Sequence, residues 1–158
     1  MKQSVKKTFI LPILLLANSV WAAENTLTEE QSHMVAADKV LTLQMIMKRM
    51  SETCLAETGE FISTWNSRNS TTVKNANMLV EQFYQRIKEK RGTDKANQFK
   101  MEMNDHYEKT ASGIAQGVKS SPKDKKLGTC QRFHTDINAG AWDIKNKYPN
   151  YYKMLSKY

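Results

Sequence analysis

The sequence contains few chain-breaking residues and few cysteines. Its 158 residues include six glycines, three prolines and two cysteines. So little glycine and proline excludes collagen-like and low-complexity chains, and it disfavours an all-β sandwich, which needs many tight turns. With 40% hydrophobic and 25% charged residues, the composition is that of a folded protein rather than a disordered one. The length fits a single domain.

Sequence motifs of the common catalytic classes are also missing. GxSxG, HExxH and glycine-rich phosphate loops do not occur. Beyond the first 22 residues, SxxK occurs once, at Ser120 and Lys123, without the SDN and KTG motifs that accompany it in enzymes. Nucleophilic catalysis also needs an activated side chain beside a base. We therefore predict that the protein is not an enzyme and has no catalytic residues.

The first 22 residues have the three parts of a secretory signal peptide. Three lysines precede an apolar run over residues 9–17, and Val20 and Ala22 occupy the small-residue positions before a cleavage point. The run is about half the length that a bilayer crossing requires. We predict a signal peptide at 1–22 and a single helical domain at 23–158. The mature chain is then periplasmic, with release to the outside left open, and does not insert into the membrane.

Two cysteines in an exported chain predict one disulfide, between Cys54 and Cys130. The bond would close a loop of 76 positions. In the chain-entropy model such a loop contributes up to about 4.5 kcal/mol to stability. The spacing is neither CxxC nor CxxCH, so neither a thioredoxin-like redox site nor covalent haem attachment is expected.

Apolar residues recur with a helical period along most of the chain. The first stripe steps by three or four residues from Ala36 to Cys54, after a predicted capping box of Thr28 and Gln31. A second stretch begins at Phe61, pauses over residues 66–72 (NSRNSTT), which are poor helix formers, and resumes until Gly92. A third runs from Thr93 and frays at Gly113 and Gly117.

The clearest predicted loop is 119–128 (KSSPKDKKLG). A fourth helix is expected from Thr129, with Ala141 and Ile144 among its core positions and its end at residues 148–150, and 151–158 could form a short helical piece. Short connections between amphipathic helices favour antiparallel neighbours. The predicted fold is therefore all-α, a disulfide-pinned four-helix up-down bundle with a short C-terminal helical turn.

Methionine and histidine offer candidate ligands for copper or haem. His33, His106 and His134 are too dispersed for a standard zinc motif. Met47 with Met50 has the spacing of one helix face, but these positions are also core positions, where methionine packs well. We predict no metal site and no cofactor, and keep a copper or haem-binding bundle as an alternative.

Three parts of the sequence are predicted to contact a partner: the polar segments 66–72 and 119–128, and the C-terminal run. The run from Trp142 to Tyr158 interleaves lysines with aromatic residues, a composition that suits nucleic acid or an acidic protein. Export disfavours nucleic acid. The predicted partner-binding residues are Trp65, Arg68, Asn69, Lys123, Lys125, Lys126, Tyr151 and Tyr152.

The leading hypothesis is a small exported protein that binds another macromolecule, a protein partner with an acidic surface. In its most specific form it is an inhibitor or immunity protein that neutralises an envelope-acting toxin enzyme by filling the acidic active-site cleft of that enzyme with a loop such as 66–72 or 119–126. A periplasmic chaperone or envelope-stress factor is an alternative. The sequence leaves the partner and the oligomeric state open.

Overall fold

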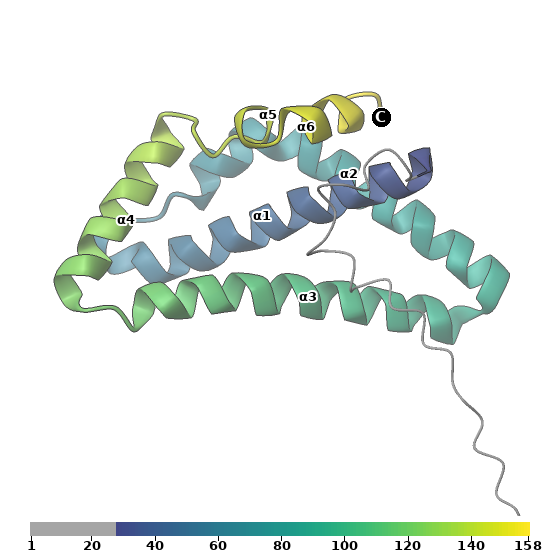
Figure 1. Cartoon of the computed structure of the whole chain (residues 1–158), viewed down its shortest axis with the longest axis horizontal. Helices are drawn as coiled ribbons and strands as arrows, with labels where there is room; N and C mark the ends of the chain where they lie inside the picture. Colours follow the sequence, from purple (N-terminus) through teal and green to yellow (C-terminus); the bar gives the residue numbers. More distant parts are fainter. Residues whose placement is uncertain (1–27) are drawn as a thin grey trace, which may run out of the picture. The chain divides into compact units, whose positions relative to one another are not determined.

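The structure is a computed structural model that describes residues 28–158. The predicted signal peptide, 1–22, lies outside the described residues. Six helices follow one another in these residues (Figure 1). They are α1 (Glu29–Thr58), α2 (Ile62–Arg91), α3 (Thr93–Lys119), α4 (Lys123–Asn138), α5 (Ile144–Lys147) and α6 (Pro149–Leu155). The chain divides into the units Met1–Ser32 and His33–Tyr158, and the packing below is that of the second unit.

The helix ends follow the predicted signals. The Thr28 backbone N–H donates to Gln31 Oε1 (2.9 Å), and the Gln31 N–H donates to Thr28 Oγ1 (3.2 Å), so the capping box is confirmed. Gly59 and Gly92 follow α1 and α2 with φ of 77° and 88°, the left-handed region that favours glycine. The stops that the sequence predicts for the first two helices are therefore real.

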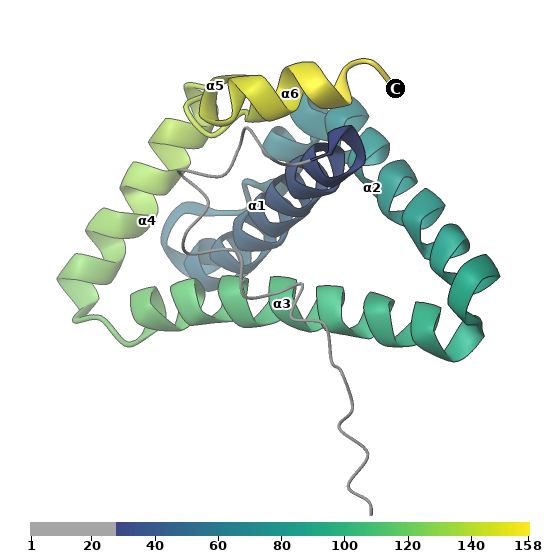
Figure 2. The ribbon, with the colours of Figure 1, turned by 45° about the vertical axis from the view of Figure 1, so that its right-hand side comes forward.

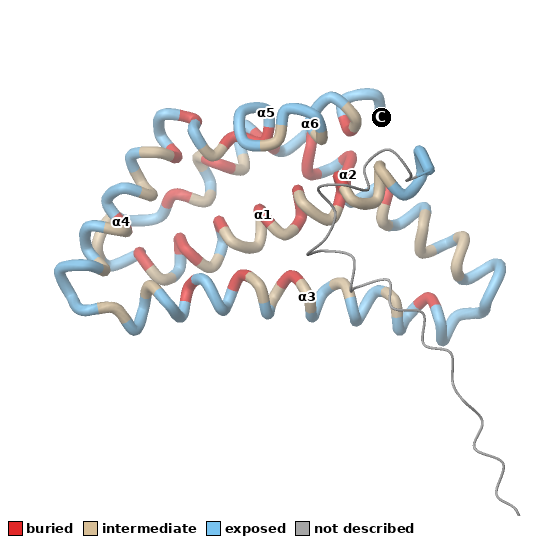
Figure 3. Tube along the Cα trace, in the orientation of Figure 1, coloured by how far each residue is buried: buried red, intermediate tan, exposed pale blue. Residues whose placement is uncertain are grey.

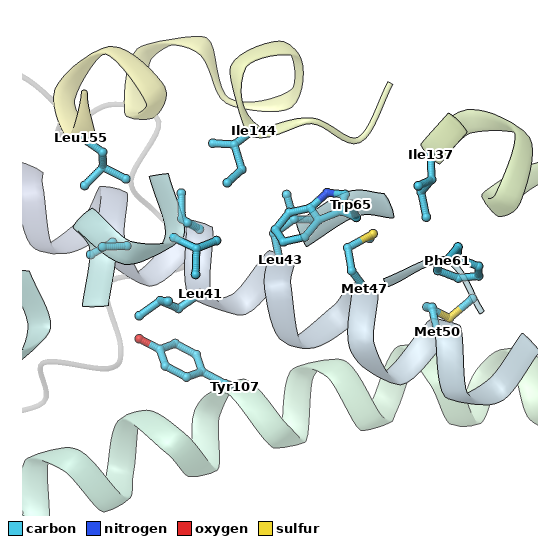
Figure 4. Close-up of a cluster of buried hydrophobic side chains, with 14 of the residues drawn as sticks. Leu41, Leu43, Met47, Met50, Phe61, Trp65, Tyr107, Ile137, Ile144 and Leu155 are labelled. Carbon is cyan, nitrogen blue, oxygen red and sulfur yellow. The ribbon is translucent and has the colours of Figure 1, made fainter. Parts of the chain in front are cut away.

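The core is built around α1. Its predicted inward stripe is buried, with each of these residues at most 2% exposed: Ala36, Val40, Leu43, Met47, Met50 and Cys54. Figure 4 shows Met47 and Met50 beside Phe61, and Trp65 close to Leu43. In Figures 1 and 2, α1 lies among the other helices, with α3 along one side and the C-terminal helices on the other.

The predicted all-α, disulfide-pinned bundle is confirmed. Cys54 of α1 and Cys130 of α4 are bonded, with their Cα atoms 5.4 Å apart. The first three helices run in alternating directions, and α4 rises across one end of them (Figure 1). The predicted C-terminal turn is present as α6, preceded by the single turn α5.

The predicted pause at residues 66–72 is wrong. These residues are helical, and α2 is unbroken over 30 residues. Asn69 and Thr72 are buried, so the segment faces the core although it is poor in helix formers. Tertiary contacts have overridden the low local propensity.

The predicted loop at 119–128 is also mostly helical. The α3 helix runs unbroken through Gly113 and Gly117 to Lys119, and α4 begins at Lys123, so only residues 120–122 connect them. Pro122 occupies the N-cap with extended geometry, φ −51° and ψ 145°. A proline there sacrifices no helix hydrogen bond, because the first N–H groups of a helix have no partner within it.

The fourth helix is shorter than predicted. It ends at Asn138, before the predicted end at residues 148–150, and Gly140 then turns the chain with φ of 77°. Ala141, an expected core position, is exposed, whereas Ile144 is fully buried. An ideal Cβ at Gly140 would lie 3.0 Å from the Asp143 carboxylate, so glycine is required there for space as well as for φ.

Candidate protein-binding surface

The N-terminal half of α2 holds the C-terminal segment by polar contacts. The Trp65 indole N–H donates to the Trp142 carbonyl at 2.8 Å, across 77 positions of sequence. The Trp65 side chain is fully buried, so this bond joins two distant segments inside the fold. Buried indole groups ordinarily find such a partner.

Asn69 satisfies both ends of its amide within the fold. Its Nδ2 donates to the Trp65 carbonyl (2.8 Å) and approaches Asp143 Oδ1 at 3.4 Å. Its Oδ1 accepts the N–H of Ile144 at 2.8 Å. Asn69 is 3% exposed, so loss of either bond would leave a buried polar group without a partner.

An ion pair closes the same junction. Arg68 Nε donates to Asp143 Oδ1 at 2.8 Å, and its Nη2 donates to the carbonyl of Ile137. The Asp143 side chain is 7% exposed, whereas that of Arg68 is 31% exposed. A buried carboxylate with a hydrogen-bonded cation is costly to disrupt, because the remaining charge cannot reach water.

The far end of the segment is anchored as well. Asn75 Nδ2 donates to the carbonyl of Leu155 at 2.8 Å. Ile144 and Leu155 are fully buried, and Figure 4 shows both pointing from the C-terminal helices toward the core. Tyr158, at the chain end, contacts His33 with its hydroxyl 2.9 Å from Nδ1. The segment from Ile137 to Tyr158 is therefore fixed on the body along its length.

The outer side of this fixed segment is basic and aromatic. Lys147 Nζ lies 4.3 Å from the centroid of the Trp142 ring, a cation–π contact. Tyr152 and Tyr158 are 38% and 48% exposed. We call this the basic tyrosine surface, made of Lys145, Lys147, Tyr151, Tyr152, Lys153, Lys157 and Tyr158.

The excess positive charge of the described residues is confined to this end of the sequence. Residues 28–118 contain twelve basic and twelve acidic side chains, whereas residues 119–158 contain nine basic and three acidic ones. Six of the described aromatic residues also lie in 119–158. The net charge of +6 that the described residues carry therefore belongs to the last forty.

The structure separates the predicted binding residues into three groups. Trp65 and Asn69 are buried, and Arg68 pairs with Asp143, so this cluster binds the protein's own C-terminal segment and offers a partner little surface. Lys123 and Lys125 are exposed at the start of α4, at the opposite end of that helix from α5 and α6 (Figures 1 and 2).

Lys126 is the third predicted binding lysine of residues 119–128, and its Nζ pairs with Glu57 Oε1 at 2.6 Å. Tyr151 is partly buried, and Tyr152 is exposed on the basic tyrosine surface. Of the predicted binding residues, only these two tyrosines thus lie on that surface.

Sequence reasoning missed Asp143 and Asn75 as partners in this junction. The available signal was the polar residues Arg68, Asn69 and Asn75, which lie within the stretch of α2 that is buried against the C-terminal segment. Polar side chains on a buried helix stretch require a hydrogen-bonding partner elsewhere in the chain.

A second cluster of titratable groups lies where α1 meets α3. His106 Nε2 is 3.9 Å from Asp38 Oδ1, and burial raises the pKa of Asp38 although His106 and Lys39 oppose the shift. The Tyr107 hydroxyl is buried without a hydrogen-bond partner among the described residues, and burial raises its pKa.

The candidate metal ligands are placed mainly for packing. Met47 and Met50 are fully buried in the core. His33 contacts Tyr158, His106 contacts Asp38, and His134 contacts Asn138. Within residues 28–158, no group of three or more His, Cys, Asp or Glu side chains is arranged to hold a metal ion.

Comparison of the chain with protein-family models, curated proteins and solved structures finds no match. Among the helices of the described part, none combines the length and apolar character that a membrane crossing requires.

Proposed function

We propose that the protein is an exported, non-enzymatic binding protein whose basic tyrosine surface docks on an acidic protein. Its most specific role is that of an inhibitor or immunity protein that neutralises an envelope-acting toxin enzyme. The observation that carries the proposal is the segregation of charge: the net positive charge of the described residues lies in 119–158. The last part of that segment, from Ile137 to Tyr158, is fixed to the body by buried polar contacts.

A fixed surface suits tight binding because little conformational entropy is lost on association. Tyrosine supplies contact area with few rotatable bonds and is frequent among residues that dominate binding energy. Lysines around it attract an acidic partner and increase the association rate. An acidic active-site cleft is such a partner, and covering it inhibits the enzyme.

Export is the second part of the proposal. It rests on residues 1–22 and on the pairing of Cys54 with Cys130, which suits an oxidising compartment. Expression of the full chain in a Gram-negative host, followed by intact-mass analysis of the periplasmic fraction, should give a chain that begins at Ala23. A full-length chain retained in the cytoplasm would contradict export, and recovery from the medium would indicate release.

The binding test uses the mature chain as bait in an envelope extract. Three baits are compared: wild type, a variant with Lys145, Lys147, Lys153 and Lys157 changed to Gln, and a control with Lys48, Lys74, Lys109 and Lys119 changed to Gln. All eight lysines are exposed, and both variants lose four charges. We expect one stoichiometric partner with wild type and control, and at least about tenfold weaker binding with the surface variant.

The outcomes separate the candidate functions. Capture that is stoichiometric, weakened by salt and lost with the surface variant supports the proposal, and the captured enzyme should lose activity on addition of the mature chain. Many weak partners would favour a chaperone. Copper or a haem absorption band in the purified protein would favour the cofactor alternative. Equal binding by all three baits would contradict this surface as the site.

A further inference from the structure

The apolar stripes of α2 and α3 are only partly covered in one region, the arm formed by residues 80–103. All seven buried residues of α2 lie between Trp65 and Leu79. Beyond them, Val80, Phe83 and Ile87 are only partly buried, although they continue the same three-and-four spacing. Figure 3 shows the change along α2, from positions coloured as buried to positions coloured as intermediate or exposed.

The α3 side of the arm is similarly open. Among its residues only Ala96 is buried, and Phe99 and Met103 are partly buried. Phe83 and Phe99 contact each other with ring centroids 5.2 Å apart, which joins the two helices but covers one side of each ring. Two paired helices leave part of their apolar stripes exposed, and most helix stability in proteins comes from covering such a stripe.

A groove lies at the root of the arm, where it joins the rest of the bundle. Its volume is about 330 Å³, and its lining is mixed: the apolar side chains of Leu41, Met78, Val80 and Met103 stand beside Asn77, Glu81, Lys100, Asn104 and Tyr107. Met78 is 41% exposed at this groove. An exposed methionine beside a groove is typical of a contact surface, because the flexible side chain adapts to a partner.

The charges of the arm are opposite at its two ends. The tip, residues 86–95, contains five basic and two acidic side chains. The root, residues 80–85 and 96–103, contains two acidic side chains and one lysine, Lys100, which pairs with Glu81. The apolar face therefore runs from a positive tip to a negative root, and an antiparallel copy of the same arm matches it in charge.

From this we infer that the arm is a homodimer interface, occupied by the arm of a second copy of this chain in antiparallel orientation. A two-fold axis pairs one surface with itself, so the surface must be self-complementary, as the arm is. The two hairpins would form a four-helix bundle, with each tip over the groove at the other root. The interface lies on α2 and α3, apart from the basic tyrosine surface, so it stands or falls independently of the proposed function.

The first test is the mass of the mature chain in solution, measured by size-exclusion chromatography with light scattering from micromolar to millimolar concentration. We expect twice the monomer mass, falling on dilution. Ile87→Glu at the tip, or Met78→Glu at the groove, should give monomers with unchanged circular dichroism. Ile114→Glu is the matched control, since Ile114 is 41% exposed on α3 outside the arm, and this variant should remain dimeric.

The second test establishes that the occupant is another copy in the antiparallel orientation. One variant reverses the tip (Lys88→Glu, Lys90→Glu) and another reverses the root (Glu81→Lys, Glu102→Lys); all four side chains are exposed. Alone, each variant places like charges together and should self-associate at least about tenfold more weakly. Mixed in equal amounts, they restore opposite charges at both contacts and should form a heterodimer.

Three results would overturn the inference. Wild type could remain monomeric throughout the concentration range. It could assemble into open-ended oligomers, which a two-fold contact does not produce. It could also form a dimer that neither Ile87→Glu, Met78→Glu nor the charge variants weaken, which would place the interface elsewhere. Captured partners in the binding test would be unaffected by any of these results.

Discussion

The two halves of α2 share one apolar period, but only the first half is buried along it. From Ile62 to Leu79 the helix is buried on one side and contacts a segment about 75 positions away through Arg68 and Asn69. From Val80 to Arg91 the period continues, yet no residue is buried. Periodicity therefore specifies which face of a helix can be buried, whereas burial itself depends on an element elsewhere that packs against that face.

The largest expected difference between the halves comes from their aromatic residues. Trp65→Ala should cost about 4 kcal/mol of unfolding free energy, because it empties a fully buried site. Phe83→Ala should cost about 1 kcal/mol, because the ring is already partly exposed. Urea unfolding measures both values. Trp65→Phe, which keeps most of the ring volume but loses the N–H to Trp142, separates packing from the hydrogen bond. Equal costs for the two alanine variants would remove the distinction.

The next largest loss of stability is expected from breaking the ion pair between Arg68 and Asp143. Arg68→Ala should cost about 3 kcal/mol, because it leaves the buried Asp143 carboxylate without its cation. Arg49 is the comparison: it contacts Glu52 and Glu108, both at least 40% exposed, so Arg49→Ala should cost less than about 1 kcal/mol. A double-mutant cycle of Arg68→Ala with Asp143→Asn should show strong coupling. Additive effects would show that the pair is not responsible.

A smaller effect distinguishes two asparagines on the same helix. Asn69→Ala should cost about 2 kcal/mol, because the Ile144 N–H loses its buried acceptor. Asn77→Ala should change stability by less than about 0.5 kcal/mol, since its exposed side chain bonds only to the Val73 carbonyl one turn earlier. Chemical unfolding of the two variants under one condition gives the comparison, and similar costs would argue against a special role for Asn69.

Local signals were sufficient for the start of α1, for the ends of α1 and α2, and for the disulfide. The capping box at Thr28 and the glycines at 59 and 92 act through neighbouring backbone, so a short stretch of sequence contains all the information. The only two cysteines left one possible pairing, between Cys54 and Cys130. The stripe of α1 was also predictable, because every member of it is covered.

The errors share a physical cause, which is that the deciding partner lies far away in the sequence. Residues 66–72 look like a break until Asp143 and Ile144 supply partners for Arg68 and Asn69. Lys126 looks like part of a loop until Glu57 pairs with it across the bundle. For the same reason the predicted binding residues at Trp65 and Asn69 became contacts within the chain, whereas Tyr152 remained on the surface.

The smallest expected effect tests the junction at which the covered body meets the arm. Asp38 lies one turn before Leu41, which lines the groove at the arm root together with Tyr107. Burial raises the pKa of Asp38 above its ordinary value of 3.8, while His106 and Lys39 act in the opposite direction. A raised folded-state pKa means that stability is fully present below pH 3.8 and is lost as the pH rises through the folded value.

Asp38→Asn removes this titration. The variant should therefore unfold at a higher temperature than wild type at about pH 7. The gain should disappear near pH 3, where the side chain at position 38 is uncharged in wild type and variant alike. Asp105→Asn is the control, since Asp105 is exposed and pairs with Lys109 on the surface of α3. Thermal unfolding across this pH range measures the difference. A loss of stability in Asp38→Asn at neutral pH would mean that the attraction of His106 and Lys39 for the carboxylate exceeds the cost of its burial.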